Sequence, residues 1–592
     1  MGDVGLEMDV ITALISDKKI VKEADINSVH SFLPKQPKTV FIHDNMAIFA
    51  STGKGESTIA THEDDNFYCV LIGHVSPVNR IILSKRNPNP AKAVLEGFMK
   101  TGYAFMQEID MDVYCAIYEK KHGRIFLWGD EGTALRPLFY EKRGRIMSST
   151  MKSVLIFFEQ HKIPKAINKS CLQEFLSLGY VIRPETLVQG VKQARPRSYL
   201  ESTPQGIREI MMPPPQYSSR RVNRAFRTEF MRDIEESVER KLAEVRAPCV
   251  GFSGGVDSAA LVALMRKQTD RKISTIFVTF QDDSQEERDA ERLAREFDTQ
   301  HYVRRVKYST YLQSPLLNWY YDAPASNYES IPYFELANEA AKHGRSLFLG
   351  AGCDTPYGSY TYGIVKKMIA GRAFKKQFLP TFYLSQYRRA DDAMCEHLTG
   401  QCPDWKKTID KAETFDMKRG SIINRAIQLD TDLFGSHRET YTIARCICNA
   451  HSLRLLTPFK ALRILEKVNS LPWYWKTRIG IRKTEKKYFF KKIIAEKLLP
   501  PDIVYKPKRW MSAPIGDWFE HELHPVVQDV FKDLRKSPEI NAEFATQILE
   551  KHRQGQRRSF MINTLFHYAL WKRLFIEGEI EPAAKVASRG IQ

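Results

Sequence analysis

A short loop of small residues between an apolar segment and a helix constrains the fold of this chain more than any other feature. The loop reads Ser253-Gly254-Gly255-Val256-Asp257-Ser258, with a strand expected at 248–252 and a helix at 258–267. Its glycines let the backbone approach an anion, its serines supply hydroxyl donors, and the free N–H groups of the helix point the same way. We therefore predict a phosphate-binding loop. The alternative, a glycine turn without a ligand, is disfavoured by the flanking strand and helix.

Strand and helix alternate on both sides of this loop. Apolar residues predict a strand at 273–280, residues 286–297 predict a helix, and 226–244 carries apolar residues at helical spacing. This alternation is typical of a doubly wound parallel sheet, in which ligands bind at the carboxyl ends of the strands. We expect the loop to lie at such an end.

The first half of the chain has a different rhythm. Short segments at 67–72 and 112–118 alternate apolar and polar residues, and turn residues separate such segments. This pattern predicts an antiparallel, β-rich domain. A proline run at 213–215 marks a change in composition, and 592 residues exceed what one ordinary core holds. We therefore expect two domains, at 1–212 and 213–592.

Composition limits the classes of function. A formal charge of +19 raises the local concentration of polyanions without identifying them. The sequence has no run of about 18 apolar residues that would span a bilayer, and its nine cysteines do not form the paired CxxC motifs of a zinc site. We expect a cytoplasmic protein with reduced thiols. Most lysines of the basic stretch 460–509 are expected to lie on a solvated helix face.

A second glycine-rich segment, at 349–358, follows another apolar segment. Gly350 and Gly352 would allow close approach of a nucleotide, and Asp354 would share a Mg²⁺ ion with Asp257. A helix N-cap is the alternative role for Asp354 alone, and the two roles are compatible.

The first loop lacks the Gly-x-x-x-x-Gly-Lys pattern of kinase-like NTPases, and it resembles the SxGxDS signature of the PP-loop ATP pyrophosphatases. In that family the loop grips pyrophosphate, and ATP is cleaved between its α and β phosphates so that AMP becomes attached to a substrate oxygen. More closely, the chain resembles the asparagine synthetase B family over almost its whole length, with a first domain similar to a class II glutaminase. Further matching segments lie at 128–130, 136–140, 148–155, 350–354, 483–486, 498–501 and 506–508.

The resemblance implies a fold, cofactors and site residues. It implies a glutaminase-like antiparallel β-sandwich with flanking helices, followed by the parallel PP-loop sheet, and ATP with Mg²⁺ as cofactors. Lys508 would stabilise the tetrahedral intermediate and the pyrophosphate, and Lys483 would assist at a phosphate. Glu329 and Tyr328 are candidates for the base that takes the amine proton. The nucleotide would contact Ser253, Gly254, Gly255, Asp257, Ser258, Val278, Gly350 and Gly352, and the metal would bind Asp257 and Asp354.

The first domain departs from a working glutaminase. Such an enzyme uses an N-terminal cysteine as its nucleophile, but residue 2 here is Gly2 and no cysteine precedes Cys69. In such an enzyme the Asn of an Asn-Gly-Glu segment helps to hold the oxyanion. Here the segment is Ile72-Gly73-His74, with Ile72 at the position of the Asn, so this donor is missing as well. We predict that this domain makes no ammonia.

An amide-forming enzyme without ammonia needs another amine, most economically one within the substrate. β-Lactam synthetases and lasso-peptide cyclases both have this property and both resemble the chain. Ala351 replaces the larger residues that asparagine synthetases and β-lactam synthetases carry there, which enlarges the pocket. With the +19 charge this favours an acidic peptide, and hence a lasso-peptide cyclase that joins an Asp or Glu side chain to the N-terminal amine. A precursor peptide is the expected partner, and a leader-peptide protease is a second candidate partner.

Other interpretations remain beside this one. A tRNA-modifying PP-loop enzyme would explain the charge but not the glutaminase-like domain, and we expect neither a nucleic acid nor a membrane as partner. A scaffold without activity would not need an intact loop at 253–258. The region 360–440, rich in aromatic and basic residues, would either shape a cavity for the peptide or form a plain helical core.

Overall fold

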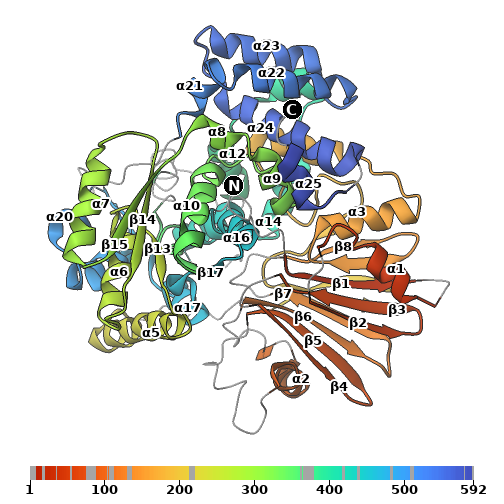
Figure 1. Ribbon diagram of the computed structural model, residues 1–592, viewed down its shortest axis with the longest axis horizontal. Coiled ribbons are helices and arrows are strands. Elements are labelled where there is room, and N and C mark those ends of the chain that lie inside the picture. The colour runs from red at the N-terminus through yellow and green to blue at the C-terminus, as the bar shows by residue number, and fades with distance from the viewer. Residues whose placement is uncertain are drawn as a thin grey trace.

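The computed structural model places two β-rich layers beside a third sheet that is surrounded by helices (Figure 1). It describes residues 8–16, 20–34, 37–53, 57–74, 89–102, 104–105, 112–129, 136–212, 221–359, 363, 379–415, 421–435, 440–479, 484–506, 513–578 and 580–589. Of the helices in these ranges, none is both long enough and apolar enough to cross a membrane.

The N-terminal region is a sandwich of two six-stranded sheets in which neighbouring strands are antiparallel. The first sheet has the order β10-β8-β9-β1-β3-β2 and the second β12-β11-β7-β6-β5-β4. The strands are β1 (Val10–Ile15), β2 (Lys38–His43), β3 (Met46–Ser51), β4 (Thr58–Glu63), β5 (Phe67–His74), β6 (Asp112–Glu119), β7 (Arg124–Gly129), β8 (Leu138–Glu141), β9 (Arg145–Ser148), β10 (Lys192–Gln193), β11 (Ser198–Thr203) and β12 (Gly206–Met211).

Alternation along the strands explains how the sandwich packs. Ile11 and Ala13 of β1 face the second sheet, whereas Val10 and Leu14 face helices, because successive side chains of a strand point to opposite faces. On β5, Val70 joins the inter-sheet core in the same way. The flanking helices are α1 (Glu23–Ser28), α2 (Pro90–Thr101), α3 (Met151–Gln160) and α4 (Lys169–Leu178). The predicted antiparallel sandwich with flanking helices is confirmed.

The second region is built on a parallel sheet of five strands, in the order β15-β14-β13-β16-β17. The chain starts at the central strand β13, adds β14 and β15 on one side, and then adds β16 and β17 on the other. This reversal makes the carboxyl end of β13 the expected ligand crevice. The strands are β13 (Cys249–Gly251), β14 (Ser274–Thr279), β15 (Gln300–Arg305), β16 (Ser346–Phe348) and β17 (Arg454–Leu456).

Helices cover both faces of this sheet, as a doubly wound fold requires (Figure 1). Those nearest the sheet are α5 (Arg224–Ala243), α6 (Val256–Arg266), α7 (Gln285–Glu296), α10 (Ser330–His343) and α16 (Thr440–Ala450). The helices predicted at 226–244, 258–267 and 286–297 are confirmed, with ends that differ by one or two residues. The predicted parallel sheet is confirmed as well.

Residues 379–415 and 421–435 form a group of helices that packs against the N-terminal region. Leu178 and Tyr180 share one hydrophobic core with Leu379 and Tyr383 of this group. In addition, Glu174 of α4 accepts an ion pair from Lys411 at 2.5 Å. The described part of the 360–440 region is therefore helical, and its core is shared with the first domain. The helices are α12 (Leu379–Tyr387), α13 (Asp392–Thr399), α14 (Trp405–Glu413), α15 (Ile422–Leu429) and the π-helix η4 (Asp430–Gly435).

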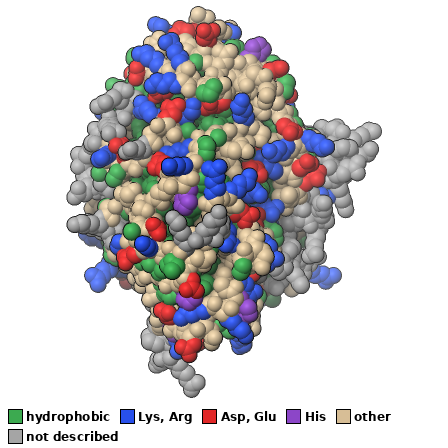
Figure 2. All heavy atoms as spheres, turned by 90° about the vertical axis from the view of Figure 1, so that its right-hand side faces the viewer, with side chains coloured by type: hydrophobic (Ala, Val, Ile, Leu, Met, Phe, Trp, Pro, Cys, Tyr) green, Lys and Arg blue, Asp and Glu red, His purple; other side chains and the backbone are tan. Residues whose placement is uncertain are grey.

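Charged side chains of both signs share the surface. On the face shown in Figure 2, Lys and Arg side chains lie among Asp and Glu side chains over the described residues. The net charge of +19 is therefore not gathered into one basic patch on that face.

Lys476, at the end of α18 (Trp473–Lys476), is a buried amine with little compensation. Its Nζ donates to the carbonyl of Asn469 at 3.4 Å, and burial lowers the pKa of Lys476 from 10.5 to about 7. Between these pH values the unfolded chain holds a proton that the folded chain has released. The free energy of unfolding must therefore rise with pH across that window, by up to about 1.4 kcal/mol per pH unit.

We expect Lys476→Met to stabilise the protein at pH 7 and below, by about 2 kcal/mol, because an apolar side chain of similar length removes the cost of burying the ammonium. The advantage should shrink as pH rises towards 10. Chemical denaturation at pH 6, 7 and 9 measures this, and Lys497→Met, at an exposed lysine in the same stretch, is the control. Equal or lower stability of Lys476→Met at pH 6 would contradict the assignment.

Candidate active site

The glycine loop lies where β13 ends and α6 begins. Gly254 has φ +64, and a Cβ there would lie 3.2 Å from the backbone of Ala290 on α7, so only glycine fits. Ser253 Oγ accepts a hydrogen bond from the N–H of Gly255 at 3.3 Å, and the N–H of Ser253 donates to Ser258 Oγ at 3.2 Å. These hydrogen bonds fix the conformation of the loop and orient the two serine hydroxyls toward its turn.

The second glycine segment packs directly on the first. A Cβ on Gly350 would lie 3.0 Å from the carbonyl carbon of Asp257 and 3.1 Å from the N of Ser258. Gly350 therefore allows the turn after β16 to touch the start of α6. The two segments that the sequence predicted as separate nucleotide contacts form one continuous surface.

Lys487 joins these two segments electrostatically. Its Nζ lies 2.5 Å from Asp257 Oδ2 and 2.6 Å from Asp354 Oδ1, and its side chain is only 5% exposed. Burial alone would lower the pKa of Lys487, but the two carboxylates outweigh it and raise the pKa well above its usual value. The amine is therefore a fixed positive charge, and the predicted metal ligands Asp257 and Asp354 are brought together around it.

The two carboxylates fit a magnesium ion that arrives with a polyphosphate. Asp257 Oδ1 is buried and makes no hydrogen bond to the described residues, so an acceptor is available beside the glycine loop. Among those residues there is no group of three or more His, Cys, Asp or Glu side chains that would hold a metal by itself. Mg²⁺ commonly takes one or two carboxylates and completes its shell with phosphate oxygens and water. The residues present fit that mode.

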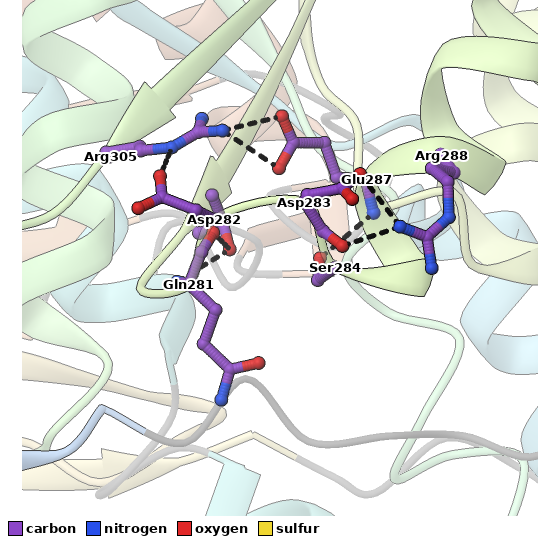
Figure 3. Close-up of polar contacts among 8 residues, drawn as sticks. Gln281, Asp282, Asp283, Ser284, Glu287, Arg288 and Arg305 are labelled. Atoms are coloured by element: carbon purple, nitrogen blue, oxygen red, sulfur yellow. Dashed lines mark hydrogen bonds and ion pairs between the residues drawn. The ribbon is translucent and has the colours of Figure 1, made fainter.

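The loop at 280–284, which follows β14 at the carboxyl edge of the parallel sheet, is held by ion pairs and hydrogen bonds (Figure 3). Arg305, the last residue of β15, donates to Asp282 and lies 2.9 Å from Glu287 of α7. Arg288 pairs with Asp283 at 2.7 Å, and Ser284 accepts from the N–H of Glu287 as the N-cap of α7. These contacts fix the loop that follows the strand end at which Val278 is buried.

The chain returns to this edge near its C-terminal end. Lys506 lies 2.5 Å from Asp289 of α7, and Asp502 of α20 (Pro501–Val504) lies 2.8 Å from Arg292. Ala290 of the same helix touches Gly254, so residue 506 lies beside the helix that backs the loop. Lys508 and Lys483, the predicted catalytic lysines, lie outside the described residues.

Glu329 is the N-cap residue of α10, and its backbone N–H donates a hydrogen bond to Asn327 Oδ1 at 3.1 Å. Because α10 leads back into β16, it runs antiparallel to the strands and begins at their carboxyl edge. Glu329 and its neighbour Tyr328 are half-buried at that edge. Their place is compatible with the predicted base, which stays a prediction.

Two lysines of the basic stretch are exceptions to the expected solvated face. Lys476 and Lys487 are buried, whereas the other described lysines of 460–509 are half-buried or exposed. Lys487 is the site residue that sequence reasoning missed. Its signal was the apolar run that starts one residue later and contains the buried Phe489 and Phe490, which draws the preceding lysine into the core.

The glutaminase-like domain carries no reactive thiol among its described residues. Cys69 and Cys115 are buried, and burial raises the pKa of Cys115 well above its usual value. Ile72, at the position of the missing oxyanion donor, is fully buried, and two residues further on His74 Nε2 lies 3.1 Å from Glu244, which also pairs with Arg454 at 2.7 Å. His74 thus contacts the second domain, whereas Gly2 lies outside the described residues.

Comparison with known proteins identifies both regions. The asparagine synthase family model matches residues 229–573, and the glutamine amidotransferase domain model matches residues 87–212. A putative glutamine-hydrolysing asparagine synthetase of Mycobacterium bovis is 24% identical over 538 residues, which cover 83% of this chain and 80% of that protein. Glutamine-hydrolysing asparagine synthetase 1 of Bacillus subtilis is 21% identical over 597 residues, 88% of each chain.

Proposed function

The chain belongs to the asparagine synthase family, whose members are ATP-dependent amide-forming enzymes, and from this premise we propose that it is a macrolactam synthetase of the lasso-peptide cyclase type. It activates the side-chain carboxylate of an Asp or Glu in a precursor peptide as an acyl-adenylate. The N-terminal amine of the same peptide then closes the ring, and AMP and pyrophosphate are released.

The adenylation step is proposed because Lys487 pairs with Asp257 of the loop 253–258 and with Asp354 of the second glycine segment, so the two segments meet at one site. The loop's N–H groups and the hydroxyls of Ser253 and Ser258 bind the polyphosphate. Asp257 and Asp354 would hold Mg²⁺, which neutralises charge on the departing pyrophosphate when it is bound. Lys487 is buried and charged, and it orients these two carboxylates. When the polyphosphate binds, part of its pairing with the carboxylates would be replaced by pairing with phosphate oxygens.

The bonds balance in two steps. The substrate carboxylate oxygen attacks the α phosphorus, and the bond to the β phosphate breaks. The amine then attacks the acyl carbon, the bond to AMP breaks, and the amine proton passes to a base, for which Glu329 stays the candidate. Lys508 is proposed to stabilise the charge of this tetrahedral intermediate, as the family resemblance implies, and a fixed charge in such a site is worth several kcal/mol.

The source of the amine separates this chain from its relatives. Gly2 replaces the nucleophilic cysteine, and Ile72, a buried apolar residue, replaces the Asn that helps to hold the oxyanion. Both features argue against ammonia from glutamine, so the amine is proposed to arrive within the substrate. Ala351, between Gly350 and Gly352, leaves room for a bulky substrate, and the charge of +19 favours an acidic peptide.

The test uses synthetic peptides with a free N-terminal amine and one internal Asp or Glu, incubated with the full chain, ATP and Mg²⁺. We expect a product lighter by one water, together with one AMP for each ring. N-acetylated peptide is the matched control, because it can be adenylated but not closed. Lys508→Ala should lose most of the product. If small amino acids are cyclised instead, or if glutamine is required, the peptide cyclase proposal is wrong.

A further inference from the structure

A further lysine, Lys460, follows the end of β17 and lies beside the turn at 350–354. The N–H of Leu349 donates to the carbonyl of Leu456 at 2.9 Å, so β16 and β17 end side by side at the carboxyl edge. The next residues form the short helix η5 (Pro458–Lys460), and the N–H of Lys460 donates to the carbonyl of Thr457 at 3.0 Å. Lys460 therefore belongs to the same edge as the glycine loop and the Gly350 turn.

The stem of Lys460 lies along that turn. A Cβ on Gly352, which has φ +99, would lie 2.5 Å from Cγ of Lys460 and 3.3 Å from its backbone N. Only a glycine at 352 allows this approach. Gly352 follows Ala351 and lies two residues before Asp354, so the lysine stem packs against the turn that carries both residues.

The ammonium of Lys460 is held by an aromatic ring. Its Nζ lies 3.8 Å from the centre of the ring of Tyr441, which is buried on α16. A cation over an aromatic face is attracted by the electrons of the ring, and this attraction orients the charge. Two lysines therefore contact this turn. Lys487 pairs with Asp354 and with the neighbouring Asp257, whereas the stem of Lys460 packs at Gly352 and its ammonium lies over Tyr441.

We propose that Lys460 binds the substrate carboxylate before adenylation and so selects acidic side chains. A carboxylate that approaches ATP is repelled by the phosphates, and Lys487 is paired with Asp257 and Asp354, the residues that would hold Mg²⁺. A second cation at the same turn, Lys460, offsets this repulsion and leaves the carboxylate oxygen able to react. This inference rests on the proposed function, since it names the residue that recognises the carboxylate which that function activates.

The experiment measures adenylation separately from ring closure. N-acetyl-L-glutamate α-amide and N-acetyl-L-aspartate α-amide serve as carboxylate probes with ATP, Mg²⁺ and hydroxylamine. Hydroxylamine attacks the acyl carbon of the adenylate, AMP leaves, and the hydroxamate is quantified. We expect Lys460→Met to raise the KM for the carboxylate at least tenfold while the Kd for ATP stays within about twofold. Lys460→Arg should recover most of the affinity.

Arg463→Met is the matched control, because it removes one positive charge from an exposed position three residues further on. It should leave the KM for the carboxylate unchanged. Tyr441→Leu should raise that KM less than Lys460→Met does, whereas Tyr441→Phe keeps the ring and should behave like the wild type.

Two results would overturn the inference. One is an unchanged carboxylate KM in Lys460→Met, and the other is a loss that appears only in ATP affinity or in thermal stability. Failure of the proposed function looks different: the wild type would form hydroxamate but no ring, and the Lys460 comparison would still be decisive. If the wild type forms no hydroxamate from these probes or from any acidic peptide, both proposals are wrong.

Discussion

Replacing Lys487 with methionine is expected to lower the rate of ATP-dependent AMP formation by about 100-fold or more. Lys487 Nζ bridges Asp257 and Asp354 at 2.5 and 2.6 Å from a nearly buried position. Without it, two carboxylates face one another beside the loop that must receive a polyphosphate. Removing one partner of a buried ion pair costs about 3–5 kcal/mol, and here the cost falls on the site itself.

The measurement is AMP formation together with ATP affinity, for Lys487→Met and for Lys486→Met. Lys486 is the matched control, since it is the preceding lysine and is half-exposed. Thermal unfolding separates a damaged site from a damaged fold. A Lys487→Met enzyme that keeps more than a tenth of the wild-type rate would remove Lys487 from the phosphate site.

Replacing Lys152 with methionine is expected to destabilise the protein by about 3–5 kcal/mol, the largest stability effect predicted for this chain. The Lys152 side chain on α3 is fully buried, pairs with Asp322, and donates to the carbonyl of Trp319 at 2.6 Å. Its Nζ also lies 4.1 Å from the Trp319 ring centre. Burial lowers the pKa of Lys152, opposed by Asp322. The variant leaves the Asp322 charge without this cation.

This pair links the glutaminase-like region to the amide-forming region, so its loss should loosen one from the other. Chemical denaturation measures the cost. The double variant Lys152→Met with Asp322→Asn should recover part of it, because no unbalanced charge remains. A cost below 1 kcal/mol for the single variant would show that the pair does not couple the two regions.

The site could be predicted from the sequence where its parts are local. The loop at 253–258 and the turn at 350–354 each carry their own signal, small residues after an apolar strand. That they touch is a consequence of topology, because β13 and β16 are neighbours in the sheet and end at the same edge. Parallel order could be anticipated from the alternation of strand and helix.

Lys487 and Lys152 could not be predicted because each acts through a contact between distant parts of the chain. Lys487 meets Asp257 across 230 residues of sequence, and Lys152 meets Asp322 across 170. Nothing adjacent to either lysine encodes the partner. Composition was misleading for Lys487, since a stretch of many lysines is usually solvated; the apolar run after it indicates burial, but only the fold shows which carboxylates it meets.

The glutaminase-like domain has features that could be predicted from the sequence and a contact that could not. Gly2 and the Ile72-Gly73-His74 segment could be recognised from the sequence as departures from a working enzyme. The contact of His74 with Glu244, and of Glu244 with Arg454, became visible only in the structure. His74, two residues after the position of the missing donor, is thus part of the interface between the domains.

The most direct test of the central claim follows an oxygen atom. The claim is that the loop 253–258 serves the transfer of AMP to a carboxylate. The substrate peptide carries ¹⁸O in its acidic side chain, and we expect one ¹⁸O atom in the phosphate of the released AMP. The reason is that the bridging carboxylate oxygen leaves with AMP when the amine attacks the acyl carbon. Formation of ADP, or label in pyrophosphate with none in AMP, would contradict it.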